Sequence, residues 1–183
     1  MYNRLFALII FIFFIPVFLF VAFAIFLEDG APIFFKQKRV GVNYTFFNIY
    51  KFRSMKKNTP NVATHLLENP AQYLLKVGGL LRKFSLDELP NLINIIKGDM
   101  VFVGPRPALY NQDDLMALRV ATGVHKLKPG ITGWAQINGR DDISIEKKVQ
   151  LEQEYMLRRS TLFDIEIIIM TFTNVLFSKG VSH

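Results

Sequence analysis

The sequence contains no cysteine and only three histidines, and both shortages exclude classes of protein. Without cysteine there is no disulfide scaffold, no thiolate metal site and no cysteine nucleophile. His65, His125 and His183 are too far apart in the chain for the paired histidines of a helical zinc site. The length of 183 residues allows one domain of ordinary size, and a content of 51% hydrophobic residues excludes a disordered chain.

Basic charge is concentrated in one block. The net charge is +7, yet residues 1–29 hold only Arg4, Glu28 and Asp29, whereas residues 30–86 hold ten Lys and Arg residues against one Glu. A basic block that follows an apolar segment suits anionic lipid headgroups or phosphorylated ligands, and the positive-inside tendency places it in the cytoplasm. Nucleic acid is the competing ligand, and a solvated basic face is the commonest explanation of a charge run.

Residues 5–27 form an uncharged apolar segment that only Pro16 interrupts. The segment is long enough for a membrane helix and too long for the core of a signal peptide, and no small-residue cleavage site precedes Glu28. Proline removes a backbone hydrogen bond, so Pro16 predicts a kink. Basic residues flank both ends of the segment. Two arrangements therefore remain open: a helix that crosses the bilayer, and a helix that bends and returns to the same face.

The rest of the chain predicts a mostly helical α+β fold. Residues 33–40 and 45–52 are rich in aromatic and β-branched residues and predict a hairpin, and residues 58–70 predict a loop. A helix is expected over 71–84, where Gly78 and Gly79 either weaken it or let another backbone approach. A second helix runs from Ser85 to a stop at Gly98, followed by a short strand over 101–103. Further helices are expected at 111–122, 144–159 and 164–177, the last either in the core or on the bilayer surface.

The segment SLDELP at 85–90 carries the most chemical information. Ser85 and Glu88 have the spacing of a capping box, which is a complete structural explanation. The functional interpretation is that backbone N–H groups hold Asp87 ionised, so that it acts as a nucleophile of the aspartyl-phosphate type. Glu88 then offers oxygen to a hard cation.

Three other segments carry polar side chains suited to phosphate. Arg106 stands between two prolines in GPRP at 104–107, which predicts a rigid arginine for an anion. In KFRSM at 51–55, strand alternation places Lys51 and Arg53 on one face. Arg140 in NGR at 138–140 and Asp164 fit an ordinary turn and a helix cap when taken alone.

These segments, together with KGDM at 97–100 and PGITGWAQ at 129–136, occur in an order that resembles the bacterial sugar transferase family. These are the monotopic phosphoglycosyl transferases that initiate glycan assembly, here in the minimal form, with the resemblance covering about residues 4–181. It implies a re-entrant membrane helix over 1–29, with both ends cytoplasmic and the break at Pro16. It also implies a catalytic domain over 30–183 with amphipathic helices at the membrane surface, on the cytoplasmic face of the bacterial inner membrane.

The resemblance further implies a two-step transfer of a sugar 1-phosphate from a UDP-sugar to undecaprenyl phosphate, with release of UMP. Asp87 matches the nucleophile, Glu88 the Mg²⁺ ligand and Arg106 a further catalytic position. Lys51, Arg53, Arg140 and Asp164 are the expected substrate-binding residues. The product would pass to downstream glycosyltransferases of capsule, exopolysaccharide or lipopolysaccharide assembly.

Two positions depart from the family pattern. Relatives usually carry Ser where this chain has Ile15, and commonly an acid where it has Ala7.

The segments at 61–65 and 107–112 resemble members that handle N-acetylated amino sugars, so UDP-N-acetylfucosamine or a related deoxy-amino sugar is the expected donor.

Two other classes of protein compete with this interpretation. A silent lipid-binding anchor would recruit glycan enzymes and would not need Asp87, Glu88 and Arg106. A nucleic-acid binder would use the basic hairpin at 33–53, and the apolar N-terminal segment speaks against it. We therefore expect no nucleic-acid partner.

Overall fold

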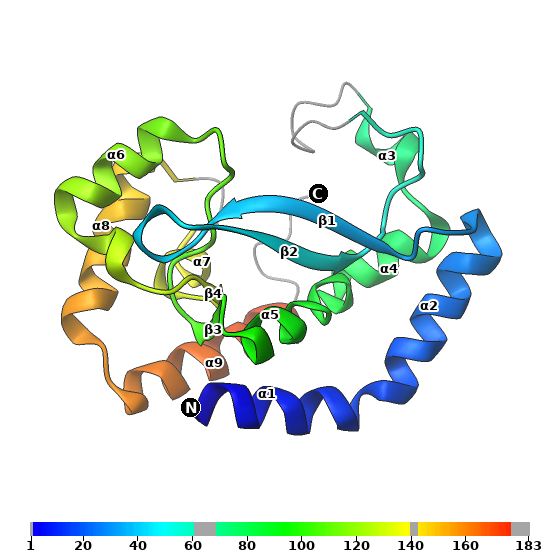
Figure 1. Ribbon diagram of the computed structural model, residues 1–183, viewed down its shortest axis with the longest axis horizontal. Coiled ribbons are helices and arrows are strands. Elements are labelled where there is room, and N and C mark those ends of the chain that lie inside the picture. The colour runs from blue at the N-terminus through cyan, green and yellow to red at the C-terminus, as the bar shows by residue number, and fades with distance from the viewer. Residues whose placement is uncertain (1, 61–68, 140–142, 177–183) are drawn as a thin grey trace.

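The computed structural model describes residues 2–60, 69–139 and 143–176. A β-hairpin crosses the middle of the molecule, and the first two helices form an elbow along one side of it (Figure 1). Helices from the second half of the chain gather at one end of the hairpin, and shorter helices lie at the other end. The fold is mixed α and β and mostly helical, as the sequence predicts.

The elbow consists of α1 (Tyr2–Phe13) and α2 (Ile15–Asp29), which are bent by 62° relative to each other. The break lies at Phe14, and Pro16 stands two residues later in the first turn of α2, so the predicted kink is confirmed. Pro16 has no N–H to donate to the preceding turn, and its ring crowds the carbonyl four residues back. Among the described helices none is alone long and apolar enough to cross a membrane, but this bent pair is when the two helices are taken together.

The hairpin pairs β1 (Phe34–Val40) with β2 (Phe46–Phe52) in antiparallel register, with Phe34 opposite Phe52. A short 3₁₀ turn, η1 (Val42–Tyr44), connects the strands, and Asn43 and Tyr44 adopt positive φ there. The predicted hairpin is confirmed. Of the loop predicted at 58–70, residues 61–68 lie outside the described part of the chain.

The helix predicted over 71–84 is wrong in its continuity. The structure has α3 (Pro70–Tyr73) and α4 (Lys76–Lys83), separated by two extended residues, Leu74 and Leu75. Hydrogen bonds from Leu75 N–H to the Ser54 carbonyl and from Lys56 N–H to the Tyr73 carbonyl replace the helical ones.

The two adjacent glycines of α4, Gly78 and Gly79, have different neighbours. A Cβ at Gly78 would overlap the Ser54 carbonyl oxygen, whereas one at Gly79 would meet only the Leu74 side chain, at 3.3 Å. The predicted close approach of another backbone is therefore confirmed, and it is specific to Gly78.

The segment after α4 starts its α-helix later than expected. A 3₁₀ turn, η3 (Leu86–Glu88), precedes α5 (Asn91–Lys97), and the α-helix begins just after Pro90, which has no N–H to give to a preceding turn. Gly98 ends α5 in the left-handed conformation, with φ 93°, so the predicted stop is confirmed.

The second half of the chain is built around a small parallel pair of strands, β3 (Val101–Val103) and β4 (Gly130–Thr132). Helices α6 (Asp113–Thr122), α8 (Ile145–Arg158) and α9 (Thr161–Leu176) confirm the three predicted helices within a few residues. Two short elements complete it, η4 (Val124–Lys126) and α7 (Trp134–Ile137).

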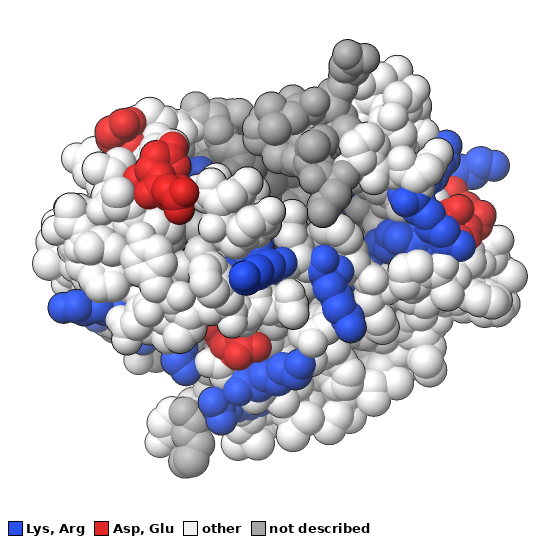
Figure 2. Space-filling view, turned by 45° about the horizontal axis from the view of Figure 1, so that its top comes forward, with Lys and Arg blue, Asp and Glu red and all other residues white. Residues whose placement is uncertain are grey.

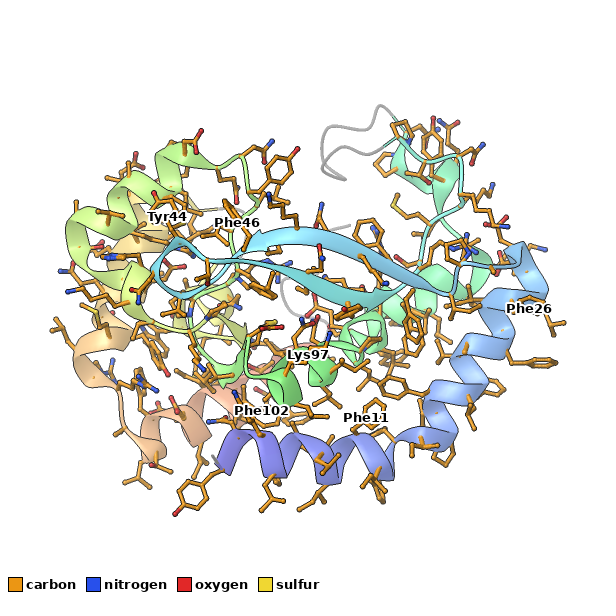
Figure 3. The ribbon with its side chains drawn as sticks, viewed as in Figure 1. Phe11, Phe26, Tyr44, Phe46, Lys97 and Phe102 are labelled. Carbon is orange, nitrogen blue, oxygen red and sulfur yellow. The ribbon has the colours of Figure 1, made fainter. Side chains whose placement is uncertain are left out.

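The elbow shares its hydrophobic core with the rest of the chain. Phe18, Val21 and Ile25 of α2 pack in one cluster with Phe52 and Leu75. Phe11 also points from α1 into this region, whereas Phe26 points outward from α2 (Figure 3).

A second cluster joins α1 to α5. It contains Ala7, which is fully buried, with Ile49, Leu92, Ile95 and Met100. The small side chain of Ala7 suits this close packing, and a carboxylate buried there would lose its hydration.

Many apolar side chains remain exposed on α1, α2 and α9. On α1 and α2 they comprise Leu5, Phe6, Leu8, Ile9, Ile12, Phe13, Ile15, Leu19, Phe20, Phe23, Phe26 and Leu27. On α9 they comprise Leu162, Ile165, Ile169 and Phe172. An exposed apolar surface of this extent marks an interaction site rather than an ordinary solvated face.

Candidate active site

The two acidic residues of interest, Asp87 and Glu88, lie on the single turn η3. Ser85 precedes this turn with φ 54°, in the left-handed region, and its side chain makes no capping hydrogen bond. The predicted capping box is therefore wrong, because the chain must reverse sharply between α4 and η3. Glu88 does not reach back to Ser85 but forms an ion pair with Lys51 instead.

Glu88 is the centre of a charged cluster. Its Oε1 lies 2.5 Å from Lys51 Nζ, at the end of β2, and 3.9 Å from an Arg106 guanidinium nitrogen in the turn after β3. The structure thus brings together Lys51, Glu88 and Arg106 from three separate segments. On the face of the molecule drawn in Figure 2, basic side chains predominate over acidic ones near the middle.

Asp87 lies next to this cluster in a partly dehydrated position. Burial raises the pKa of Asp87 to about 6, and the nearby Glu88 charge adds to the increase, while Lys51 and Arg82 oppose it. A backbone hydrogen bond favours the ionised form, as expected, but its contribution is smaller than the opposing effect of burial. With this pKa about 90% of the carboxyls are still ionised at pH 7. A poorly solvated carboxylate with basic neighbours is suited to nucleophilic attack.

The turn that carries Arg106 is held from both sides by other arginines. Arg39 on β1 donates to the Pro107 carbonyl at 3.0 Å, and Arg119 on α6 donates to the Arg106 carbonyl at 2.9 Å. Arg119 is in turn paired with Glu152 on α8 at 2.5 and 2.8 Å. Both members of this pair are at most 4% exposed. The position of Arg106 is therefore set by the hairpin and by the helical end of the molecule together.

Arg39, Lys51, Glu88, Asn91 and Arg106 line one pocket. Apolar side chains from β2 and from the segments around β3 and β4 complete its wall, among them Ile49, Met100 and Ile131. Three cationic side chains around a single carboxylate make this pocket suited to phosphate groups.

Three predicted site residues do not lie in this cluster. Arg53 follows the end of β2 and binds the end of α2, through the Asp29 carboxylate and the carbonyls of Gly30 and Pro32, both at 2.6 Å. Asp164 accepts a hydrogen bond from Tyr155 on α8 at 2.8 Å, and this bond and burial together raise the pKa of the Tyr155 hydroxyl. Arg140 lies outside the described residues.

Sequence reasoning missed Arg39, Asn91 and the Arg119–Glu152 pair. Asn91 had a detectable signal, because a position three residues after Glu88 falls on the same face of a helical turn. Arg39 could be placed only once the register of the hairpin and its contact with the Arg106 turn were known. The partners Arg119 and Glu152 stand on different helices, and nothing in their sequence separation links them.

Glu88 is the residue predicted to hold a divalent cation. The described ranges contain no group of three or more His, Asp or Glu side chains that could hold a metal ion. Mg²⁺ is commonly held by one or two carboxylates, with substrate phosphates and waters as the other ligands. The Glu88 carboxylate, the predicted Mg²⁺ ligand, fits that kind of donor set.

Comparison with known proteins identifies the family. The model of the bacterial sugar transferase family matches residues 1–178. A Bacillus subtilis protein named "Uncharacterized sugar transferase EpsL" is 45% identical over 157 residues, which cover 86% of this chain and 76% of that protein. The Escherichia coli UDP-glucose:undecaprenyl-phosphate glucose-1-phosphate transferase is 40% identical over 164 residues, covering 85% of this chain but only 35% of its own length.

A third relative carries a different sugar in its name. The UDP-N-acetylgalactosamine-undecaprenyl-phosphate N-acetylgalactosaminephosphotransferase of Aeromonas hydrophila is 33% identical over 172 residues, which cover 91% of this chain and 41% of that protein. The chain belongs to the bacterial sugar transferase family. The predicted family and the predicted class of enzyme, a sugar transferase, are thereby confirmed.

Proposed function

We propose that the protein transfers a sugar 1-phosphate from a UDP-sugar to undecaprenyl phosphate and releases UMP. The observation that carries the proposal is the partly dehydrated Asp87 carboxylate beside the cluster of Lys51, Glu88 and Arg106. The Escherichia coli and Aeromonas hydrophila relatives, whose names include a UDP-sugar and undecaprenyl phosphate, support this choice of substrates.

In the first half of the reaction, an Asp87 carboxylate oxygen attacks the phosphorus that bears the sugar. The new oxygen–phosphorus bond forms as the bond from that phosphorus to the bridging oxygen breaks. UMP departs with the bridging oxygen and its electron pair. Lys51 and Arg106 offset the negative charge on the transferred group and on the leaving phosphate.

In the second half, a phosphate oxygen of undecaprenyl phosphate attacks the same phosphorus. The bond to Asp87 breaks, the carboxylate is regenerated, and the product is a polyprenyl diphosphate-linked sugar. Mg²⁺ held by Glu88 would supply additional positive charge at the phosphates. We expect the product to pass to downstream glycosyltransferases that extend the glycan.

We assign the elbow of α1 and α2 to the membrane, as a re-entrant helix with both ends on the cytoplasmic face of the inner membrane. The 62° bend and the exposed apolar side chains of α1, α2 and α9 support this placement. The position of Ile15, 40% exposed at the bend, is compatible with contact to lipid tails. Such a surface site would also keep water from the Asp87–phosphosugar intermediate.

An N-acetylated amino or deoxy sugar, such as N-acetylfucosamine, is our proposal for the transferred group. The relatives name both glucose and N-acetylgalactosamine, so a donor panel must include neutral and N-acetylated sugars.

The test measures UMP release by the purified protein in lipid with Mg²⁺, undecaprenyl phosphate and that panel. We expect UMP from one donor, and none from Asp87→Asn. UMP formation at the wild-type rate by Asp87→Asn would refute the assignment of the nucleophile. A wild-type protein that releases no UMP from any donor would favour the silent anchor.

A further inference from the structure

Asn91 occupies an unusual position in the pocket beside Glu88. It is the first residue of α5, one helical turn after Glu88, and only 1% of it is exposed. Backbone bonds from Leu92 to Leu89 and from Ile93 to Pro90 keep this turn helical. The side chain of Asn91 therefore lines the same pocket wall as Glu88.

The amide oxygen of Asn91 is buried without a hydrogen-bond partner in the described part of the chain. Asn94, one turn further along α5, shows what a structural asparagine does here. Asn94 is fully buried, accepts from Tyr50 N–H at 3.1 Å and donates to the Asn48 carbonyl at 2.7 Å. A buried polar atom left unpaired lowers stability, so an asparagine kept in that state calls for a partner that the folded chain does not supply.

The chemistry of the pocket narrows down that partner. Lys51, Arg39 and Arg106 can only donate hydrogen bonds, and the Glu88 carboxylate is engaged by Lys51 and Arg106. The Asn91 oxygen is a neutral acceptor among these donors. A ligand that satisfies both kinds of group carries a phosphate and, close to it, a hydroxyl or amide N–H. Undecaprenyl phosphate has the phosphate but no such neutral donor, whereas a sugar nucleotide has both.

We propose that the Asn91 amide oxygen accepts a hydrogen bond from a hydroxyl or amide N–H of the UDP-sugar. This inference rests on the proposed function, since it names a recognition contact of the same site. The bonding group belongs either to the transferred sugar or to the ribose of the nucleotide, and the two sources are separable by experiment.

The experiment compares Asn91→Leu, which keeps the branched shape of the side chain and removes the acceptor, with Asn94→Leu as the matched control on the same helix. Asn91→Leu should lower kcat/KM for the UDP-sugar by roughly tenfold to a hundredfold. It should leave the KM for undecaprenyl phosphate unchanged. The unfolding temperature should be unchanged or higher. Asn94→Leu should lower the unfolding temperature, because two backbone groups lose their partner.

Inhibition by UMP separates the two sources. Weaker inhibition of Asn91→Leu than of the wild type places the hydrogen bond at the ribose, and equal inhibition places it at the sugar. An unchanged kcat/KM for the UDP-sugar would overturn the proposal. So would a loss of stability comparable to that of Asn94→Leu. If Asn91→Leu does not fold, Asn91→Ala is measured by the same criteria.

A second readout does not depend on turnover. UDP-glucose and UDP-N-acetylgalactosamine are each added to the folded protein without undecaprenyl phosphate, and the rise in unfolding temperature is recorded. An increase in the unfolding temperature of the wild type that is smaller in Asn91→Leu supports the hydrogen bond between Asn91 and the UDP-sugar. This holds even if no UMP is formed, because then only the proposed reaction fails. A rise of equal size in both proteins overturns the contact while leaving the reaction open to the assay of UMP.

Discussion

The environment of Asp87 makes a quantitative prediction about stability. The pKa of this carboxyl is raised from 3.8 to about 6. The folded chain therefore binds the proton more tightly than the unfolded chain does, and ionisation works against folding. The cost is absent below about pH 4 and reaches its full size above about pH 6. A shift of this size corresponds to about 3 kcal/mol, and the attraction of Lys51 and Arg82 is already contained in it.

Replacing Asp87 by Asn imitates the protonated carboxyl at every pH. We expect Asp87→Asn to be more stable than the wild type by about 3 kcal/mol at pH 7.5, and equal to it near pH 4. For a chain of this size the difference amounts to roughly 6–12 °C in the unfolding temperature. The same variant should form no UMP, so its stability increases while its activity is lost. Such a trade-off is common for a catalytic group that the fold keeps in a destabilising environment, here a partly dehydrated one.

The assay is thermal unfolding of wild type and variant in the same lipid preparation between pH 4 and 8. Asp113→Asn, in the exposed first turn of α6, controls for the loss of one acidic side chain. A variant less stable than the wild type at pH 7.5 would refute the reasoning. A stability difference that stays constant over the pH range would refute it equally, because the effect would then not arise from ionisation of Asp87.

Three further predictions concern packing and ion pairs. Removing one member of the buried pair, as in Arg119→Met or Glu152→Leu, should cost about 3–5 kcal/mol in denaturation experiments, and the double variant should recover most of the loss; equal losses in single and double variants would contradict this. Gly78→Ala should lower the unfolding temperature by several degrees, because the new Cβ would overlap the backbone of Ser54. Gly79→Ala should be neutral or up to about 1 kcal/mol more stable than the wild type. The reverse order of stability would show that the close approach of the two backbones is misplaced. Arg53→Lys should destabilise the chain by about 2 kcal/mol, since a lysine cannot serve the carboxylate and two carbonyls at once, and unchanged thermal unfolding would count against that role.

Local patterns were sufficient to predict much of the fold. Two segments rich in aromatic and β-branched residues identified the hairpin, and apolar residues at helical spacing identified α9. Pro16 located the bend because its effect on a helix is purely local. Gly98 likewise ended α5 through its own backbone freedom, with φ 93°.

The errors arose where distant segments compete with local preference. Ser85 and Glu88 satisfied the spacing of a capping box, yet the ion pair of Glu88 with Lys51, 37 residues earlier, takes the acid away from that role. The helix predicted over 71–84 was interrupted because its middle pairs with the backbone of Ser54 and Lys56. Neither contact could be read from the residues of the segment itself.

The candidate site was likewise predictable from local motifs but not from contacts between distant segments. The order of the motifs nominated Lys51, Glu88 and Arg106, which the structure brings together. Strand alternation grouped Arg53 with Lys51, but β2 ends at Phe52 and Arg53 binds the end of α2. The Arg119–Glu152 pair required knowledge of how α6 and α8 lie against each other.

The two arginines that bind the Arg106 turn have a consequence for exchanging segments between related proteins. Its carbonyls are bound by Arg39 from the hairpin and by Arg119 from α6, and Arg119 depends on Glu152 of α8. A chimaera that imports the short turn alone would keep the motif but lose the geometry of its arginine. Inheritance of this motif is thus tied to three other positions, the first and last of which, 39 and 152, are 113 positions apart. Substitutions at Arg119 and Glu152 are expected to be tolerated together and rejected one at a time.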